Sequence, residues 1–160
     1  MVFDSQRKIF HTVFTVWPFD EQLDRSLPQK PTMTLRIFIV DDSDPVREAI
    51  KSLLRSDPNK WLVCGEVVDG DDAVERAAEA IPDVILLDLS LPQIHGSVLA
   101  TKLRDAIPAA AIVLMSAQDP RLMRQLADSF QVEHCLPKSN LGSELITTLE
   151  NISRKRPRSA

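Results

Sequence analysis

Short apolar segments recur along most of this chain, and each is followed by a segment with helical periodicity. Residues 35–40 read LRIFIV, and residues 83–89 and 111–115 carry similar runs of aliphatic side chains. Weaker runs at residues 61–68 and 133–136 bring the number of predicted strands to five. Strands without a polar face must be covered on both sides, as happens when helices cross over between parallel strands. The sequence therefore predicts an α/β fold, a doubly wound, five-stranded parallel sheet with helices on both faces.

The segments between the strands fit helices of about ten residues. The first is expected to begin at Asp44, as N-cap, with Pro45 in the first turn, and to stop near residues 57 and 58. The remaining helices are predicted over residues 73–80, 97–106, 120–130 and 143–152. In sheets of this kind ligands bind at the carboxyl ends of the strands, so the strand ends are where chemistry is expected.

Composition excludes several classes of protein. A 160-residue chain with 44% hydrophobic and 26% charged residues is not disordered throughout, and its net charge of −4 does not favour electrostatic binding to nucleic acid over the whole domain. No apolar run approaches the roughly 18 residues that a membrane span needs. Cys64 and Cys135 have neither a disulfide pattern nor zinc-ligand spacing, which favours a cytoplasmic location.

The two ends of the chain differ from its centre. Five of the eight aromatic residues lie within the first 19 positions, whereas regular alternation begins only after Met33. The first segment is interpreted as a flexible tail or as the product of a start codon placed too early; an aromatic anchor for a partner is the alternative. The predicted parts are an N-terminal extension over residues 1–33, a domain over residues 34–153 and a basic tail over residues 154–160.

Polar residues stand at the ends of four of the five predicted strands. Asp41 and Asp42 follow the first strand, Asp88 the third, Ser116 the fourth and Lys138 the fifth. Singly, each fits a helix cap, a turn or a solvated charge. Together they form an acidic cluster whose mutual repulsion calls for a cation, and Mg²⁺ suits oxygen ligands of this kind.

The stretches FIVDDSDPVRE, LLDLSLPQIHG, VLMSAQ and LPKS resemble the receiver domains of bacterial two-component response regulators. The resemblance covers residues 34–153 and implies the flavodoxin-like arrangement of the predicted fold. VLMSAQ and LPKS are most similar to receivers joined to a LuxR-type DNA-binding output domain, but only eight residues, SRKRPRSA, follow position 152. The output is therefore expected to be something other than DNA binding by a helix-turn-helix.

The resemblance implies a role for each residue at the strand ends. Asp88 would be the phosphoacceptor. Mg²⁺ would be bound directly by Asp42, Asp88 and the backbone carbonyl of Ser90, and through water by Asp41. Lys138 would pair with one phosphoryl oxygen, and Ser116 would hydrogen-bond another. Phosphoryl transfer depends on positioning and charge neutralisation, which such a set supplies. In the loop after the acceptor, Leu91, Pro92 and Gly96 also match the family.

The sequence departs from the family near Lys138. Cys135 occupies a position that commonly carries tyrosine or phenylalanine, so we expect a weaker readout, or one that uses other side chains. A small core thiol is the preferred interpretation of Cys135, and a redox sensor the alternative. Proline precedes Lys138 instead of following it, so a cis peptide is not required there. Gln118 could orient a water for dephosphorylation, and His95 and His134 are interpreted as ordinary polar residues.

Three functions remain open from the sequence. The first is a stand-alone receiver, not an enzyme for any other substrate, which takes a phosphoryl group from a sensor histidine kinase or a phosphotransfer protein. It would then signal to a downstream protein partner through the helix at 120–130, the fifth strand and the last helix. The resemblance also implies a possible homodimer, because receivers of this family often dimerise. The second is a pseudo-receiver that binds its partner without phosphate. The third, an aspartyl phosphatase or nucleotide-binding enzyme, lacks the expected motifs.

Overall fold

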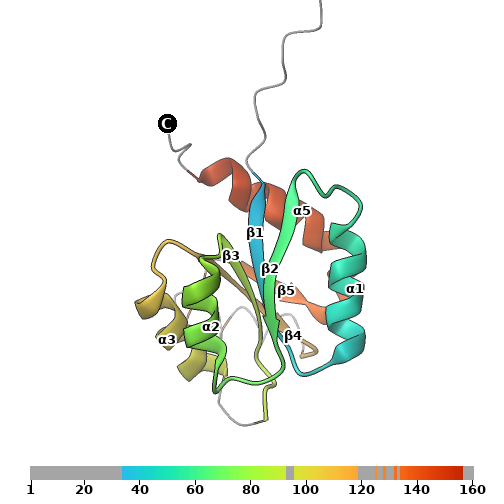
Figure 1. Cartoon of the computed structure of the whole chain (residues 1–160). Coiled ribbons are helices and arrows are strands. Elements are labelled where there is room, and N and C mark those ends of the chain that lie inside the picture. The colour runs from blue at the N-terminus through green and yellow to red at the C-terminus, as the bar shows by residue number, and fades with distance from the viewer. Residues whose placement is uncertain are drawn as a thin grey trace, which may run out of the picture. The chain divides into compact units, whose positions relative to one another are not determined.

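The computed structural model describes residues 34–92, 96–118, 125, 128, 132 and 134–156. Five strands form one parallel sheet in the order β2-β1-β3-β4-β5, which confirms the predicted fold class (Figure 1). Their bounds are β1 (Leu35–Val40), β2 (Trp61–Val67), β3 (Val84–Asp88), β4 (Ala111–Ser116) and β5 (His134–Pro137). The order reverses between β1 and β3, so the loops that leave these two strands open a crevice at their carboxyl ends.

Helices cover both faces of the sheet, with α1 and α5 on one side and α2 and α3 on the other (Figure 1). Side chains along β1 alternate accordingly: Ile37 and Ile39 pack toward α1 and α5, while Phe38 and Val40 pack toward α2 and α3. The helices are α1 (Asp44–Leu54), α2 (Ala73–Ala80), α3 (Gly96–Ala106), α5 (Leu141–Lys155) and the short 3₁₀ helix η1 (Lys138–Asn140). The two apolar layers hold β1 and β3, and with them the strand ends, in a fixed place.

The starts of α1 and α5 differ from the expected ones. The N-cap of α1 is Ser43, not Asp44, because the Ser43 backbone is extended and its carbonyl accepts the N–H groups of Val46 and Arg47 at 3.1 and 3.0 Å. Helix α5 begins earlier than expected, at the buried Leu141, because η1 leads directly into it. A local sequence pattern places the ends of helices only to within one or two residues.

Several expected elements lie outside the described residues. These are the N-terminal extension, the end of the basic tail beyond residue 156 and nearly all of the helix at 120–130, of which Gln125 and Asp128 are described and helical. In the part of the chain that the structure describes, no helix combines the length and apolarity needed to cross a bilayer.

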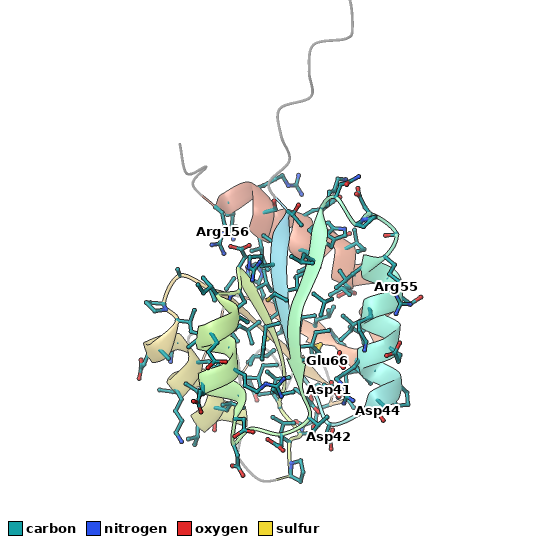
Figure 2. The ribbon with its side chains drawn as sticks, viewed as in Figure 1. Asp41, Asp42, Asp44, Arg55, Glu66 and Arg156 are labelled. Carbon is teal, nitrogen blue, oxygen red and sulfur yellow. The ribbon has the colours of Figure 1, made fainter. Side chains whose placement is uncertain are left out.

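Charged side chains tie elements together at the amino ends of the strands. Arg36 donates to the carbonyls of Ala80 and Ile81 at the end of α2, at 2.7 and 3.1 Å. Arg156 donates to the carbonyl of Asp83 at 2.7 Å and lies 2.9 Å from its carboxylate. Figure 2 shows Arg156 at the end of the sheet opposite to Asp41. Arg156, which belongs to the predicted basic tail, is therefore bound to Asp83.

Candidate functional site

Three carboxylates meet at the carboxyl ends of β1 and β3. These strands are neighbours with Val40 opposite Leu87, so the next residues, Asp41 and Asp88, lie at the same level. Carboxylate oxygens of Asp41, Asp42 and Asp88 lie within 4.8 Å of one another. Asp41 and Asp88 are fully buried, whereas Asp42 is exposed, and Figure 2 shows Asp41 and Asp42 together at this end of the sheet. The structure thus brings together the acidic residues that the sequence singled out.

One lysine joins the two buried carboxylates. Lys138 follows β5 as the first residue of η1, and its Nζ lies 2.8 Å from Oδ2 of Asp41 and 2.8 Å from Oδ2 of Asp88. The other oxygens accept backbone donors, because the N–H of Ser43 binds Asp41 Oδ1 at 2.9 Å and the N–H of Ser90 binds Asp88 Oδ1 at 3.0 Å. These contacts fix both carboxylates in orientation and leave the exposed Asp42 facing solvent.

Ser116 lies on the strand between the acid and the lysine. It is the last residue of β4 and is fully buried. Asp88 on β3 pairs with Met115, and Ser116 pairs with Pro137, the residue before Lys138. The backbone N–H of Gln118 donates to Ser116 Oγ at 3.0 Å, which holds the hydroxyl at the strand end. The hydroxyl, the carboxylate and the ammonium group therefore lie at the carboxyl ends of three adjacent strands.

Burial and charge act against each other in this pocket. Burial raises the pKa of Asp41 above its ordinary value, although the nearby ammonium group of Lys138 and the hydrogen bond from the Ser43 N–H act in the opposite direction. Burial by itself lowers the pKa of Lys138, but its contacts with the carboxylates of Asp41 and Asp88 outweigh this effect and raise the pKa. One ammonium group thus serves two buried carboxylates, and Asp41 is the carboxylate it compensates incompletely.

The pH dependence of stability follows from the raised pKa of Asp41. Between its ordinary and its raised pKa, Asp41 binds more protons in the folded than in the unfolded state, so its contribution to the free energy of unfolding falls as pH rises. In Asp41→Asn this contribution is lost. Urea unfolding of the wild type and of this variant, both free of metal, is measured from about pH 4 to 7. We expect the free energy of unfolding of the variant, relative to that of the wild type, to increase as pH rises. A difference that shrinks with pH would contradict this assignment.

The donor set suits a hard cation. Three carboxylates face a single lysine, which leaves the cluster negatively charged, and Asp41 Oδ2 accepts no well-aligned hydrogen bond despite its distance from Lys138. Oxygen ligands with excess negative charge are the kind that small divalent cations prefer. The residues present therefore fit a divalent cation on the side where Asp42 is exposed.

The segment after Asp88 returns close to its own backbone at Gly96. A Cβ atom at Gly96 would lie 2.7 Å from Leu89 Cα, which a real side chain cannot do without moving the backbone beside Asp88. We expect Gly96→Ala to lower the free energy of unfolding by about 1–3 kcal/mol, the usual effect of overpacking. Urea unfolding measures this change.

Gly142 in α5 provides the matched control for Gly96. Nothing lies within 4 Å of a Cβ atom built at Gly142, so Gly142→Ala is expected to stabilise the protein, by up to about 1 kcal/mol, through helix propensity. Equal effects of the two substitutions would show that the close approach at Gly96 is relieved without strain.

The remaining predicted residues fall in different places. Cys135 is half-buried beside the apolar layer of α2 and α3, and burial raises the pKa of its thiol, which agrees with a core thiol more than with a redox sensor. The described residues contain no cis peptide bond. His134 is half-buried at the start of β5, whereas His95 lies outside the described residues.

Sequence reasoning missed a buried charge beside the site. Arg47 in α1 is buried, and its guanidinium donates to the backbone carbonyl of Asp41 at 2.8 Å. Glu66 on β2 lies on the other side of this arginine, with 3.8 Å between Oε1 and Nε. The available signal was spacing: Arg47 is one turn before Ile50, at the edge of the apolar face of α1.

Known proteins contain the same fold and the same sequence pattern. The sequence profile of the response regulator receiver domain matches residues 37–150. The chain belongs to this family. It is a receiver domain of the kind found in the response regulators of two-component systems, a family whose members interact with a kinase or phosphotransfer partner.

Individual relatives agree with this assignment. Over 122 residues the receiver is 29% identical to protein-glutamate methylesterase/protein-glutamine glutaminase 3 of Geobacter sulfurreducens, an alignment that covers 76% of this chain and 33% of that protein. The chain therefore spans about a third of the length of this curated relative. The methylesterase and glutaminase activities in that name are those of the whole Geobacter sulfurreducens protein.

Two solved structures are similar over most of the described chain. A LuxR-family two-component response regulator from Aurantimonas sp. SI85-9A1 is 28% identical with a TM-score of 0.69, covering 77% of this chain and 87% of that one. The REC domain of AraT, a response regulator from Geobacillus stearothermophilus, is 27% identical with a TM-score of 0.68, covering 77% and 95%. The predicted likeness to LuxR-type receivers is confirmed.

Proposed function

We propose that this receiver accepts a phosphoryl group on Asp88. The observation that carries the proposal is the contact of one ammonium group, Lys138 Nζ, with the buried carboxylates of both Asp41 and Asp88. A carboxylate oxygen of Asp88 would attack the phosphorus of a donor, whose leaving group departs with the bonding electrons, and an acyl phosphate would form. Lys138 would then neutralise a phosphoryl oxygen, and Ser116 would donate its hydroxyl to another.

Mg²⁺ is the cation we propose for the acidic cluster. Asp42 and Asp88 would bind it directly, Asp41 through water, and the backbone carbonyl of Ser90 would complete the protein ligands. When bound, the ion supplies positive charge that offsets the repulsion between the carboxylates and the incoming phosphoryl oxygens. Support comes from the oxygens of the three acids, which lie within 4.8 Å of one another, and from the incomplete compensation of Asp41.

The partners and limits of the receiver are part of the same proposal. A sensor histidine kinase or phosphotransfer protein would supply the phosphoryl group, the receiver would catalyse this transfer and its own dephosphorylation, and a downstream protein would read the result. A homodimer of the phosphorylated form and a cytoplasmic location are further expectations. The family match over residues 37–150 supports limits of 34–153 for the receiver, between the extension and the basic tail.

The pseudo-receiver is the less favoured alternative. A decayed switch is expected to have lost at least one member of the reactive set, yet Asp88, Ser116 and Lys138 are all present at the ends of adjacent strands. Cys135 in place of an aromatic side chain affects the readout and leaves the reacting groups untouched.

The test is to incubate the full-length protein with Mg²⁺ and acetyl phosphate and to measure its intact mass. We expect the mass to increase by one phosphoryl group, and the same mixture with EDTA to give no increase. Hydroxylamine should remove the added group, because it cleaves acyl phosphates and leaves phosphoserine intact. No increase with acetyl phosphate, carbamoyl phosphate or phosphoramidate would favour the pseudo-receiver.

A further inference from the structure

Four polar or charged residues are buried in the described part of the chain, namely Asp41, Arg47, Asp88 and Ser116. Three of them form the proposed phosphoryl pocket. The fourth, Arg47, has a side chain that is 8% exposed, and arginine is almost never buried unless it is paired. A charged side chain exposed to solvent would need no explanation, but the burial of Arg47 does.

The guanidinium of Arg47 faces groups on three different elements: two of its nitrogens donate hydrogen bonds, and Nε lies at ion-pair distance from a carboxylate without a hydrogen bond. Nη1 donates to the backbone carbonyl of Asp41 at 2.8 Å, at the end of β1. Nη2 donates to the carboxylate of Asp44 in α1, and Nε lies 3.8 Å from Oε1 of Glu66 on β2. Figure 2 shows Asp41, Asp44 and Glu66 gathered at the same end of the sheet. The planar fork of arginine suits such fixed, multiple contacts, which a lysine cannot reproduce.

These contacts complete the support around Asp41. Its backbone N–H donates to the carbonyl of Val67 at 3.2 Å, and its carboxylate accepts the N–H of Ser43 at 2.9 Å. Arg47 binds the remaining backbone group, the carbonyl. The backbone of Asp41 is therefore held by β2 through its N–H and by α1 through its carbonyl, and this carbonyl is part of the peptide unit that joins Asp41 to Asp42. Asp42 is exposed, so its position depends on this peptide unit more than on packing of its own side chain.

We propose that Arg47 is a positioning residue that sets the affinity of the acidic cluster for Mg²⁺ by holding the carbonyl of Asp41. This rests on the function proposed above. Arg47 acts on the ligands and not on the ion, as a partner outside the ligand set. Removal of such partners commonly lowers metal affinity by about 10- to 100-fold. A purely structural role would instead affect only the stability of α1 against β2.

The experiment is a titration of the full-length protein with MgCl₂, followed by the NMR shift of the backbone amide of Ser90, which binds Asp88. The variants are Arg47→Met, which keeps an unbranched side chain, and Arg47→Lys, which keeps the charge. Arg55→Met is the matched control, because Arg55 ends the same helix but is 68% exposed. We expect the dissociation constant to rise by at least about tenfold in Arg47→Met, by less in Arg47→Lys, and not in the control.

A second readout separates positioning from catalysis. If Arg47 acts only through the metal ligands, saturating MgCl₂ should restore the rate of phosphorylation of Arg47→Met by acetyl phosphate, whereas a direct role would leave the rate low. An unchanged dissociation constant with a lower melting temperature would overturn the inference. If Arg47→Met does not fold, the same comparison is made with Arg47→Lys. Absence of Mg²⁺ binding by the wild type would instead overturn the proposed function itself.

Discussion

Asp88→Asn is expected to abolish the gain of a phosphoryl group from acetyl phosphate. The amide has nearly the shape of the carboxylate but lacks the anionic oxygen that attacks phosphorus. The pocket should survive the change, because the charge of Asp88 is one of the causes that raise the pKa of Asp41. The metal-free variant should therefore be at least as stable as the wild type. Intact mass measures the first effect, and urea unfolding the second.

The matched control for Asp88→Asn is Asp105→Asn. It makes the same chemical change on the exposed side of α3, outside the acidic cluster, and should be phosphorylated like the wild type. A gain of one phosphoryl group by Asp88→Asn, at the wild-type rate, would show that another side chain is the acceptor. Peptide mapping after borohydride reduction of the acyl phosphate would then identify it.

Lys138→Met is expected to affect both reaction and stability. The rate of phosphorylation should fall by about 10²- to 10³-fold, the usual effect of removing one donor that stabilises a developing anion. The free energy of unfolding should fall by about 3–5 kcal/mol, because two buried carboxylates lose a cation that lies 2.8 Å from each. Stopped-flow or quenched mass measurements give the rate, and urea unfolding gives the stability.

Two further variants test the assignment of the Lys138 effects. Lys102→Met removes a lysine from the exposed face of α3 and should change neither quantity appreciably. In the double variant Asp88→Asn/Lys138→Met fewer buried charges remain uncompensated, so its stability should exceed that of Lys138→Met by more than Asp88→Asn alone stabilises the wild type. Additive effects of the two substitutions would mean that the ammonium group and the carboxylate are not coupled in solution.

The fold and the location of the acidic cluster could be predicted because both depend on the hydrophobic pattern and on the parallel direction of the strands. Runs such as LRIFIV in β1 are apolar on both faces, which only a covered sheet satisfies, and parallel strands bring their carboxyl ends to one edge whatever their side chains are. The order of Asp41, Asp88 and Lys138 along the chain therefore sufficed to place them together. The contact of one lysine with both acids needed coordinates.

The burial of Arg47 and the end of α5 were not predictable, for a common reason. An arginine in the first turns of a helix resembles a solvated charge. Its burial depends on a carbonyl of Asp41 and on Glu66, which belong to other elements. Likewise α5 begins at Leu141 because that side chain packs against the sheet. Such features arise from pairs of segments, whereas periodicity describes one segment at a time.

The ion pair between Arg156 and Asp83 affects where a probe can be attached to this protein. Because it secures the last turn of α5 at the amino ends of the strands, a fluorophore or affinity handle attached beyond residue 156 would depart from the side remote from Asp41. Such an attachment should leave the chemistry undisturbed. A dye placed there would report on the phosphorylated form only if α5 itself shifts along its length.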